Sequence, residues 1–225
     1  GGNLECVSLN LGCPTKNFGT ITASKDLTMN LGGHPELFNE GVIDVKGEAR
    51  INGSNVINHH IFSAKTVKVT SVQLLNKANL NSATNINING SRIFNYGYIK
   101  FDKNDGEKNK GKKKTDNSTA TVIINHDKAK ITGHEIEGHL SVYNDGIIEV
   151  SEFTSSSLYN SCTVIVKEEF KFQNMTLNKG SITAGRANES DTEWLPVPEI
   201  ETHANAKLTL IDGSMIKAKE FDVES

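Results

Sequence analysis

The sequence is poor in the residues that build a large globular core. Apolar residues make up 36% and aromatic residues 6% of its 225 positions, with a single tryptophan. No run approaches the roughly 18 apolar residues that a membrane-spanning helix needs. The net charge of −3 and the pI near 6.2 provide no general attraction to nucleic acid or to an anionic membrane. We therefore expect no nucleic-acid partner and no direct insertion into a membrane.

Cysteine and proline are also scarce. The three cysteines are Cys6, Cys13 and Cys162, an odd number that excludes a complete intramolecular disulfide framework, although Cys6 and Cys13 could form one bridge. Their spacing fits no zinc site. Four prolines stand against 25 asparagines and 19 glycines, a composition that favours short strands joined by tight corners.

The asparagines recur at intervals that are mostly 18–19 residues, which predicts a repeat architecture. Ten anchor positions define the repeat: Asn17, Asn39, Asn58, Asn76, Asn95, Asn125, Asn144, Asn160, Asn178 and Asp212. The fourth residue after each anchor is always apolar, as at Ile43, Phe62, Leu80 and Ile99. The residue before the anchor is apolar in every repeat except the first, which has Lys16.

The positions after each anchor alternate between apolar and polar residues, which is typical of a strand buried on one face. Ile148 is accordingly predicted to point inward and Glu149 outward. The asparagine itself would occupy a corner, facing inward. Amides in successive coils, about 4.8 Å apart, could then hydrogen-bond to one another in a ladder.

A coil of this kind cannot bury its apolar face alone, so the coils must stack. We predict an all-β fold, a single-stranded right-handed parallel β-helix (β-solenoid) of about ten 18–19-residue coils. The right-handed form is preferred to the left-handed form because no hexapeptide period is visible in the sequence. A leucine-rich repeat and an antiparallel sandwich are the alternatives. The prediction is one domain over residues 1–225, with an N-terminal cap at 1–16 and insertions at 103–117 and 187–205.

The two insertions contain the candidate binding residues. Lys112, Lys113 and Lys114 could hold a polyanion such as an acidic glycan, or belong to a solvated loop. Trp194, near two prolines, could stack on a sugar or fold back over the solenoid. Both insertions leave the repeat at the same corner, so we expect them on one edge.

Catalytic and metal-binding motifs are not recognisable in the sequence. The segments typical of polygalacturonase-like β-helix enzymes are missing, and no carboxylate pair for glycoside hydrolysis can be identified. His134 and His139 are five residues apart in strand-like sequence, whereas a zinc-protease motif needs histidines four apart on a helix. We predict no catalytic residue, no metal and no cofactor.

The segments SLYNSCTVIVKEEFKFQNMTLNKGSITAG (157–185), RIFNYGYIKFD and SVYNDGIIEV resemble the repeat region of large secreted Bacteroidetes surface proteins of the LruC-domain kind. The resemblance runs from about residue 17 to the end of the chain. It implies an extracytoplasmic protein, secreted or associated with the cell surface or outer membrane, and it identifies no functional residue.

Two functions follow from these observations. The first is a non-enzymatic surface solenoid, structural or adhesin-like, whose partner is a glycan or another surface protein. The second is a carbohydrate-binding or carbohydrate-processing β-helix. The ligand and the oligomeric state do not follow from the sequence.

Overall fold

The computed structural model describes residues 2–31, 36–84, 86–101, 121–136, 140–184, 200–211, 214–217 and 221–223. The chain forms two compact units, residues 1–121 and 122–225, which we call unit 1 and unit 2. In both units the described residues form strands, turns and bends, and none of them lies in a helix.

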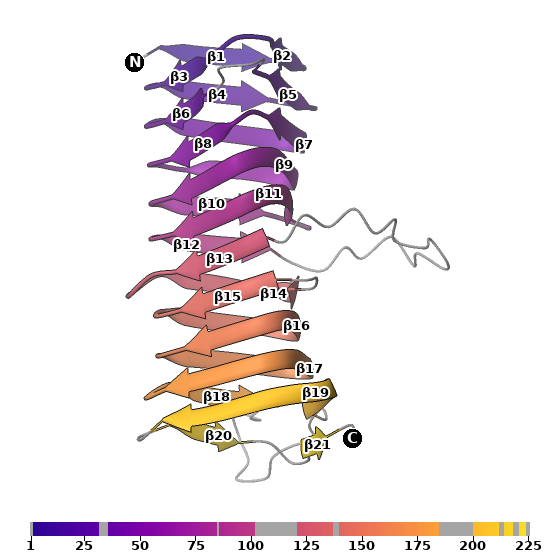
Figure 1. The fold of residues 1–225 in the computed structure, drawn as a ribbon. Coiled ribbons are helices and arrows are strands. Elements are labelled where there is room, and N and C mark those ends of the chain that lie inside the picture. Colours follow the sequence, from indigo (N-terminus) through magenta and orange to yellow (C-terminus); the bar gives the residue numbers. More distant parts are fainter. Residues whose placement is uncertain are drawn as a thin grey trace, which may run out of the picture. The chain divides into compact units, whose positions relative to one another are not determined.

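Unit 1 is a stack of parallel strands (Figure 1). Its strands are β1 (Asn3–Cys6), β2 (Leu9–Leu11), β3 (Thr15–Asn17), β4 (Thr20–Ala23), β5 (Leu27–Asn30), β6 (Glu36–Asn39), β7 (Val42–Asn52), β8 (Asn55–Asn58), β9 (Phe62–Asn76), β10 (Asn79–Ser82), β11 (Ile86–Asn95) and β12 (Tyr98–Phe101). Each strand pairs in parallel with the strand one coil further along the chain, as β1 does with β4 and β4 with β7. This pairing is that of a β-solenoid.

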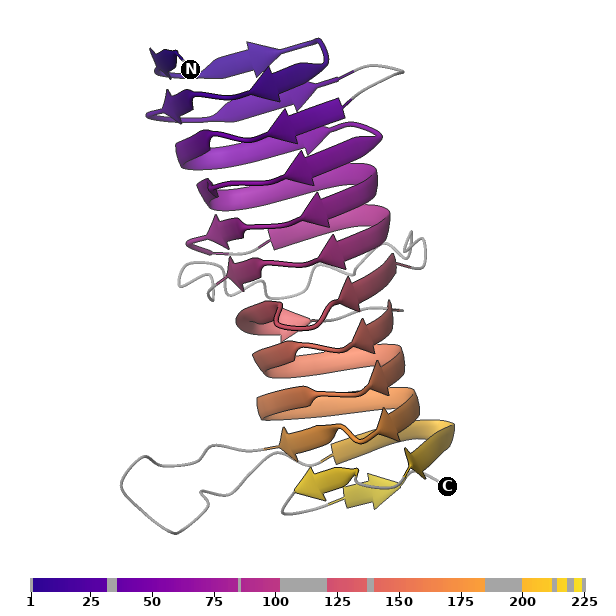
Figure 2. The ribbon, with the colours of Figure 1, turned by 90° about the vertical axis from the view of Figure 1, so that its left-hand side faces the viewer.

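Each coil of unit 1 has three strand segments, which build three faces. The first face contains β1, β4, the start of β7, the start of β9, β10 and β12. The second face contains β2, β5, the rest of β7, the middle of β9 and the start of β11. The ladder face contains β3, β6, β8 and the last segments of β9 and β11. Figure 2 shows the bends at which one segment of a coil gives way to the next.

The core of unit 1 lies inside these coils and consists of rows of stacked apolar side chains. Ile43, Phe62, Leu80 and Ile99 occupy the same register position in successive coils of the first face and are at most 4% exposed. The prediction that these four residues form one buried parallel row is confirmed.

The predicted asparagine ladder is present beside this core. In each coil the side-chain Nδ2 donates a hydrogen bond to the Oδ1 of the asparagine in the next coil, over 2.8–2.9 Å. The ladder of unit 1 consists of Asn17, Asn39, Asn58, Asn76 and Asn95, all of them buried. The Nδ2 atoms of Asn39 and Asn58 also donate to the backbone carbonyls of Ile61 and Asn79, which lie past the corner. Each amide therefore links two coils and fastens the corner as well.

Residues 1–16, expected to form an N-terminal cap, contain β1, β2 and most of β3. These strands pair in register with β4, β5 and β6 and so form a first coil. The reason is visible in the sequence, because Leu4 and Leu9 occupy the register positions of Ile21 and Leu27 in the next coil.

Unit 2 repeats the same pattern. Its strands are β13 (Thr121–Asn125), β14 (Lys130–Ile136), β15 (Leu140–Asn144), β16 (Ile147–Asn160), β17 (Thr163–Asn178), β18 (Ser181–Ala184), β19 (Ile200–Ile211), β20 (Met215–Lys217) and β21 (Phe221–Val223). Asn125 donates to Asn144 and Asn144 to Asn160, each over 2.7 Å. Phe153 and Phe170 stack in the core with ring centroids 5.5 Å apart.

Two corners of unit 2 differ from the predicted alignment. Asn160 lies opposite Leu177, not Asn178, and Ile148 lies opposite Ile131, not Ala129. Lys128, in the corner before β14, and Lys179, in the corner after β17, both adopt a left-handed backbone conformation, with φ 65° and 59°. The predicted alignment is therefore wrong at these two repeats. The Asn178 side chain is not among those described, and Asp212 lies outside the described residues.

The fold class is confirmed: each unit is an all-β parallel solenoid whose coils wind right-handed (Figure 1). The units contain about eight turns, whereas about ten coils were predicted. β19 begins at Ile200 and pairs with Phe170, so residues 200–205 of the predicted second insertion belong to a strand.

We predict that Asn58→Ala lowers the free energy of unfolding by about 1–3 kcal/mol. The substitution leaves the buried Asn76 Oδ1 without its amide donor and removes the acceptor used by Asn39. Asn55→Ala is the matched control, because Asn55 lies on the same strand and is exposed. Urea unfolding followed by circular dichroism measures both variants, and equal midpoints would contradict a stabilising ladder.

Ile148→Asp should lower the free energy of unfolding by several kcal/mol, because it places an unpaired charge at a position with 0% exposure. Glu149→Gln changes the adjacent outward-facing residue and should cost no more than about 1 kcal/mol. Thermal unfolding of the two variants compares them. A similar loss of stability in both would show that the inward and outward assignment is incorrect.

Candidate binding surfaces

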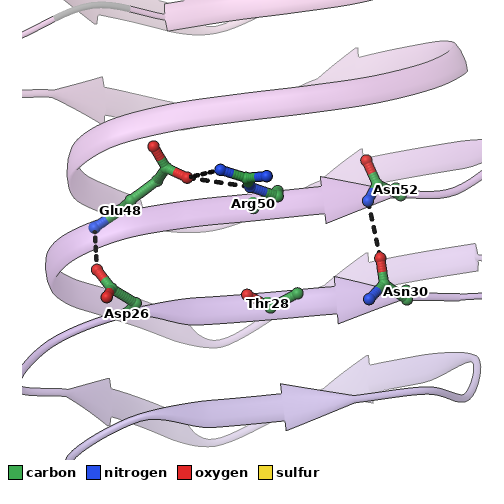
Figure 3. Close-up of a pocket in the computed structure, with 6 residues that line it drawn as sticks. All are labelled: Asp26, Thr28, Asn30, Glu48, Arg50 and Asn52. Atoms are coloured by element: carbon green, nitrogen blue, oxygen red, sulfur yellow. Dashed lines mark hydrogen bonds and ion pairs between the residues drawn. The ribbon is translucent and has the colours of Figure 1, made fainter.

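A shallow polar depression of about 550 Å³ lies on the second face of unit 1 (Figure 3). It is lined by Asp26, Thr28, Asn30, Glu48, Arg50 and Asn52. The last five belong to β5 and β7. They alternate with buried residues along these strands, so their side chains point away from the core. Strand pairing places Thr28 beside Arg50 and Asn30 beside Asn52.

Hydrogen bonds and ion pairs connect the residues of this depression. Asn52 Nδ2 donates to Asn30 Oδ1 over 2.7 Å, outside the core. Arg50 donates through Nη2 and Nε to Glu48 Oε1, at 2.6 and 3.0 Å. In the next coil, Lys68 Nζ lies 2.6 Å from Glu48 Oε2. The hydrogen bond from Lys68 is the main cause that lowers the pKa of Glu48, and Arg50 lowers it further, although partial burial acts in the opposite direction.

The backbone before Glu48 is shaped to bring two coils close together. The register of β7 with β9 shifts between Val45 and Glu48. Within this irregular segment, Gly47 N donates to Lys25 O over 2.7 Å and Glu48 N donates to Asp26 Oδ1 over 2.8 Å. A Cβ atom on residue 47 would overlap the Lys25 carbonyl, so only glycine permits this approach.

Unit 2 carries a related cluster of charged residues on its outer surface. Glu149 accepts from Lys167 Nζ at 2.7 Å, and Lys130 Nζ lies 3.1 Å from its other oxygen. The hydrogen bonds from Lys167 and then Lys130 lower the pKa of Glu149. These side chains come from three successive coils, because strand pairing aligns Lys130 with Ile147 and Glu149 with Ile165. The carboxylate thus links the coils from outside.

A third surface feature is apolar and lies on the ladder face of unit 1. The residues immediately before the ladder asparagines align in successive strands and are half-buried. We call these residues, Phe38, Ile57, Leu75 and Phe94, the apolar stripe. They point outward because the asparagines that follow them point inward. At the adjoining corner, Phe18 and Tyr96 are 59% and 48% exposed.

The apolar stripe was present in the sequence as a column of apolar residues before the anchors, but it was not assigned to a face. The alternation of a strand supplies the missing signal, since the neighbour of an inward-facing residue must face outward. A shorter version occurs in unit 2, where the rings of Tyr143 and Tyr159 lie 6.3 Å apart in adjacent strands.

The four predicted binding residues, Lys112, Lys113, Lys114 and Trp194, lie outside the described residues. Their roles, and the shared edge of the two insertions, stay predictions. Cys6, Cys13 and Cys162 are free thiols. His134 Nε2 lies 3.4 Å from Glu152, whereas His139 is outside the described part.

Comparisons with protein-family models, with curated proteins and with solved structures find no match to this chain. Within the described ranges, no three His, Cys, Asp or Glu side chains are grouped so that they could hold a metal ion. The same residues include no helix of the length and apolarity that would cross a membrane.

The ion pairs of Glu149 predict a pH dependence of stability. A carboxyl whose pKa is lower in the folded than in the unfolded state stabilises the fold above its unfolded pKa and loses this contribution as the pH falls through the folded pKa. The stability difference between wild type and Glu149→Gln should therefore be largest above about pH 5 and shrink on acidification toward pH 3. Urea unfolding across this range measures it. A difference that stays constant with pH would contradict the role of the two lysines.

Proposed function

We propose that this chain is a non-enzymatic β-solenoid module of an extracellular or cell-surface protein, where it acts as a stalk or an adhesin-like binding element. The observation that carries this proposal is the apolar stripe. It is a row of half-buried apolar side chains on the outer surface of the solenoid, beside Phe18 and Tyr96, which are 59% and 48% exposed. Exposed apolar surface that is continuous over several coils is typical of interaction sites.

The state of the surface carboxylates supports a role without catalysis. Glu48 and Glu149 each face two cationic side chains, which lower their pKa and keep them ionised. A general acid in glycoside hydrolysis needs the opposite shift, because it must hold a proton near neutral pH. These two carboxylates are suited to ion pairs that join coils.

The extracytoplasmic location is supported by the resemblance of the repeats, such as RIFNYGYIKFD, to those of secreted Bacteroidetes surface proteins. A rigid stack of coils is also suited to holding a binding surface away from its point of attachment, because each coil is fixed to its neighbours over its whole length.

The proposal predicts retention of a glycan or surface-protein ligand without turnover. The purified chain, applied to an array of glycans and to cell-envelope extracts, should bind at least one class of ligand. The same ligands, incubated with the chain and analysed for reducing ends and for unsaturated products, should remain intact. Antibodies to the chain should label intact cells of the source organism. Cleavage products, or labelling only after lysis, would contradict the proposal.

A further inference from the structure

The apolar stripe lies between two polar margins. On one side, Asn55 and Gln73 are directly paired with each other, and each lies two residues before a stripe residue, Ile57 or Leu75. Residues two apart in a strand project from the same face of the sheet, about 7 Å from each other. The centre of the ladder face thus presents two apolar and two amide side chains, none of them charged.

The two amides of this margin are available to a ligand. In the part of the chain that the structure describes, neither the Asn55 nor the Gln73 side chain makes a hydrogen bond. Asn55 is exposed and Gln73 is half-buried. Each amide offers two N–H donors and one carbonyl acceptor, a combination that matches hydroxyl groups, which both donate and accept.

Aromatic rings stand at both ends of the stripe. The Phe38 ring has the Phe18 ring 6.3 Å away on one side and the His59 ring 5.0 Å away on the other. At the other end, Phe94 is followed across the corner by the half-exposed Tyr96. With coils about 4.8 Å apart, the row from Phe38 to Phe94 extends about 14 Å along the axis of unit 1.

The charged residues of the margins balance one another. The margin that contains Asn55 and Gln73 ends in Glu36 and Arg92. The opposite margin, two residues after the stripe, contains Glu40, His59 and Lys77. The margins therefore carry two acidic and two basic side chains. Lys16, which is paired with Phe38 in the preceding strand, adds one exposed cation at the end of the row, so the charges of the face nearly cancel. An unpaired charge laid on its uncharged centre would lose water without gaining a counter-ion.

We propose that the apolar stripe binds an uncharged, β-linked polysaccharide chain that lies along the axis of unit 1. The hexose rings of such a chain have apolar C–H faces and carry their hydroxyls at the edges. The ring faces lie on Ile57, Leu75 and the aromatic rings, and the edge hydroxyls bond to Asn55 and Gln73. An extended chain fits better than a single sugar because the row continues over four coils. This inference rests on the proposed binding function and names its ligand class.

Titration calorimetry on the whole chain tests the proposal. The probes are cellohexaose and laminarihexaose, both uncharged and β-linked, and a hexamer of galacturonic acid as the acidic counterpart. We expect saturable binding of at least one uncharged probe and weaker or no binding of the acidic one. The double variant Ile57→Thr/Leu75→Thr places threonine, a β-branched residue that favours strands, at both positions and removes apolar surface. It should lower the affinity at least tenfold.

A second variant and a control keep the test independent of folding. Asn55→Ala/Gln73→Ala leaves the stripe intact and should lower the affinity several-fold. Val72→Thr changes a side chain that is 59% exposed on the same strand as Leu75 but outside the stripe, and should bind like wild type. Circular dichroism and the thermal midpoint confirm that each variant is folded.

Three results would overturn the inference. Binding that is unchanged in both double variants would place the glycan elsewhere and leave the proposed function standing. Preferred binding of the acidic hexamer would assign the wrong ligand class. Self-association of the wild type in sedimentation, lost in Ile57→Thr/Leu75→Thr, would make the stripe an interface between copies. Failure to bind any ligand on the glycan and envelope arrays would instead contradict the proposed function itself.

Discussion

A side-chain amide in the interior of a protein must have hydrogen-bond partners, because an unpaired buried polar group costs about 1–3 kcal/mol. In this protein each ladder amide finds its partners in the next coil. Asn39 Nδ2, for example, donates both to Asn58 Oδ1 and to a backbone carbonyl beyond the corner. Only one register of the coils satisfies these bonds. A slip of one residue would also turn every core side chain toward solvent. The ladder therefore fixes the stacking within each unit, and the apolar rows fill the space that it defines.

Fixing the register inside the coils also arranges the outside. Outward side chains at equivalent positions must form straight rows, so a residue in one coil lies next to its counterpart in the following coil. The rows also bring diagonal neighbours together. Glu48 reaches Lys68, which is paired with Arg50, and Glu149 reaches Lys130 and Lys167, each two residues away from the residue paired with Glu149. The same geometry aligns the amides of Asn30 and Asn52 on the surface. Charge pairs on the surface contribute little individually, about 0–1 kcal/mol each, so they adjust the stability of a stack whose register is set from within.

The interior of the solenoid could be predicted from the sequence because it obeys two simple periods, that of the coil and that of the strand. Asn39 to Asn95 and the row from Ile43 to Ile99 follow both periods. The prediction failed at the corners that contain Lys128 and Lys179, because a lysine in the left-handed region leaves no mark in an apolar pattern. The ion pairs depend on side-chain rotamers and on pairing between coils, which the order of residues alone does not reveal. The predicted binding residues Lys112–Lys114 and Trp194 belong to segments that follow neither period.

Neighbouring residues on the ladder strands show the division between folding and function most clearly. Val56 and Leu74 are 1% exposed and form part of the core, whereas Ile57 and Leu75 are the next residues along and face outward. The inner pair contributes the burial energy that the coil needs. The outer pair could be polar without changing the register, because the ladder and the core rows already determine it. Four apolar residues in a row at such positions are thus not required by the register of the solenoid, and this is the physical reason for our proposal that the face holds a ligand.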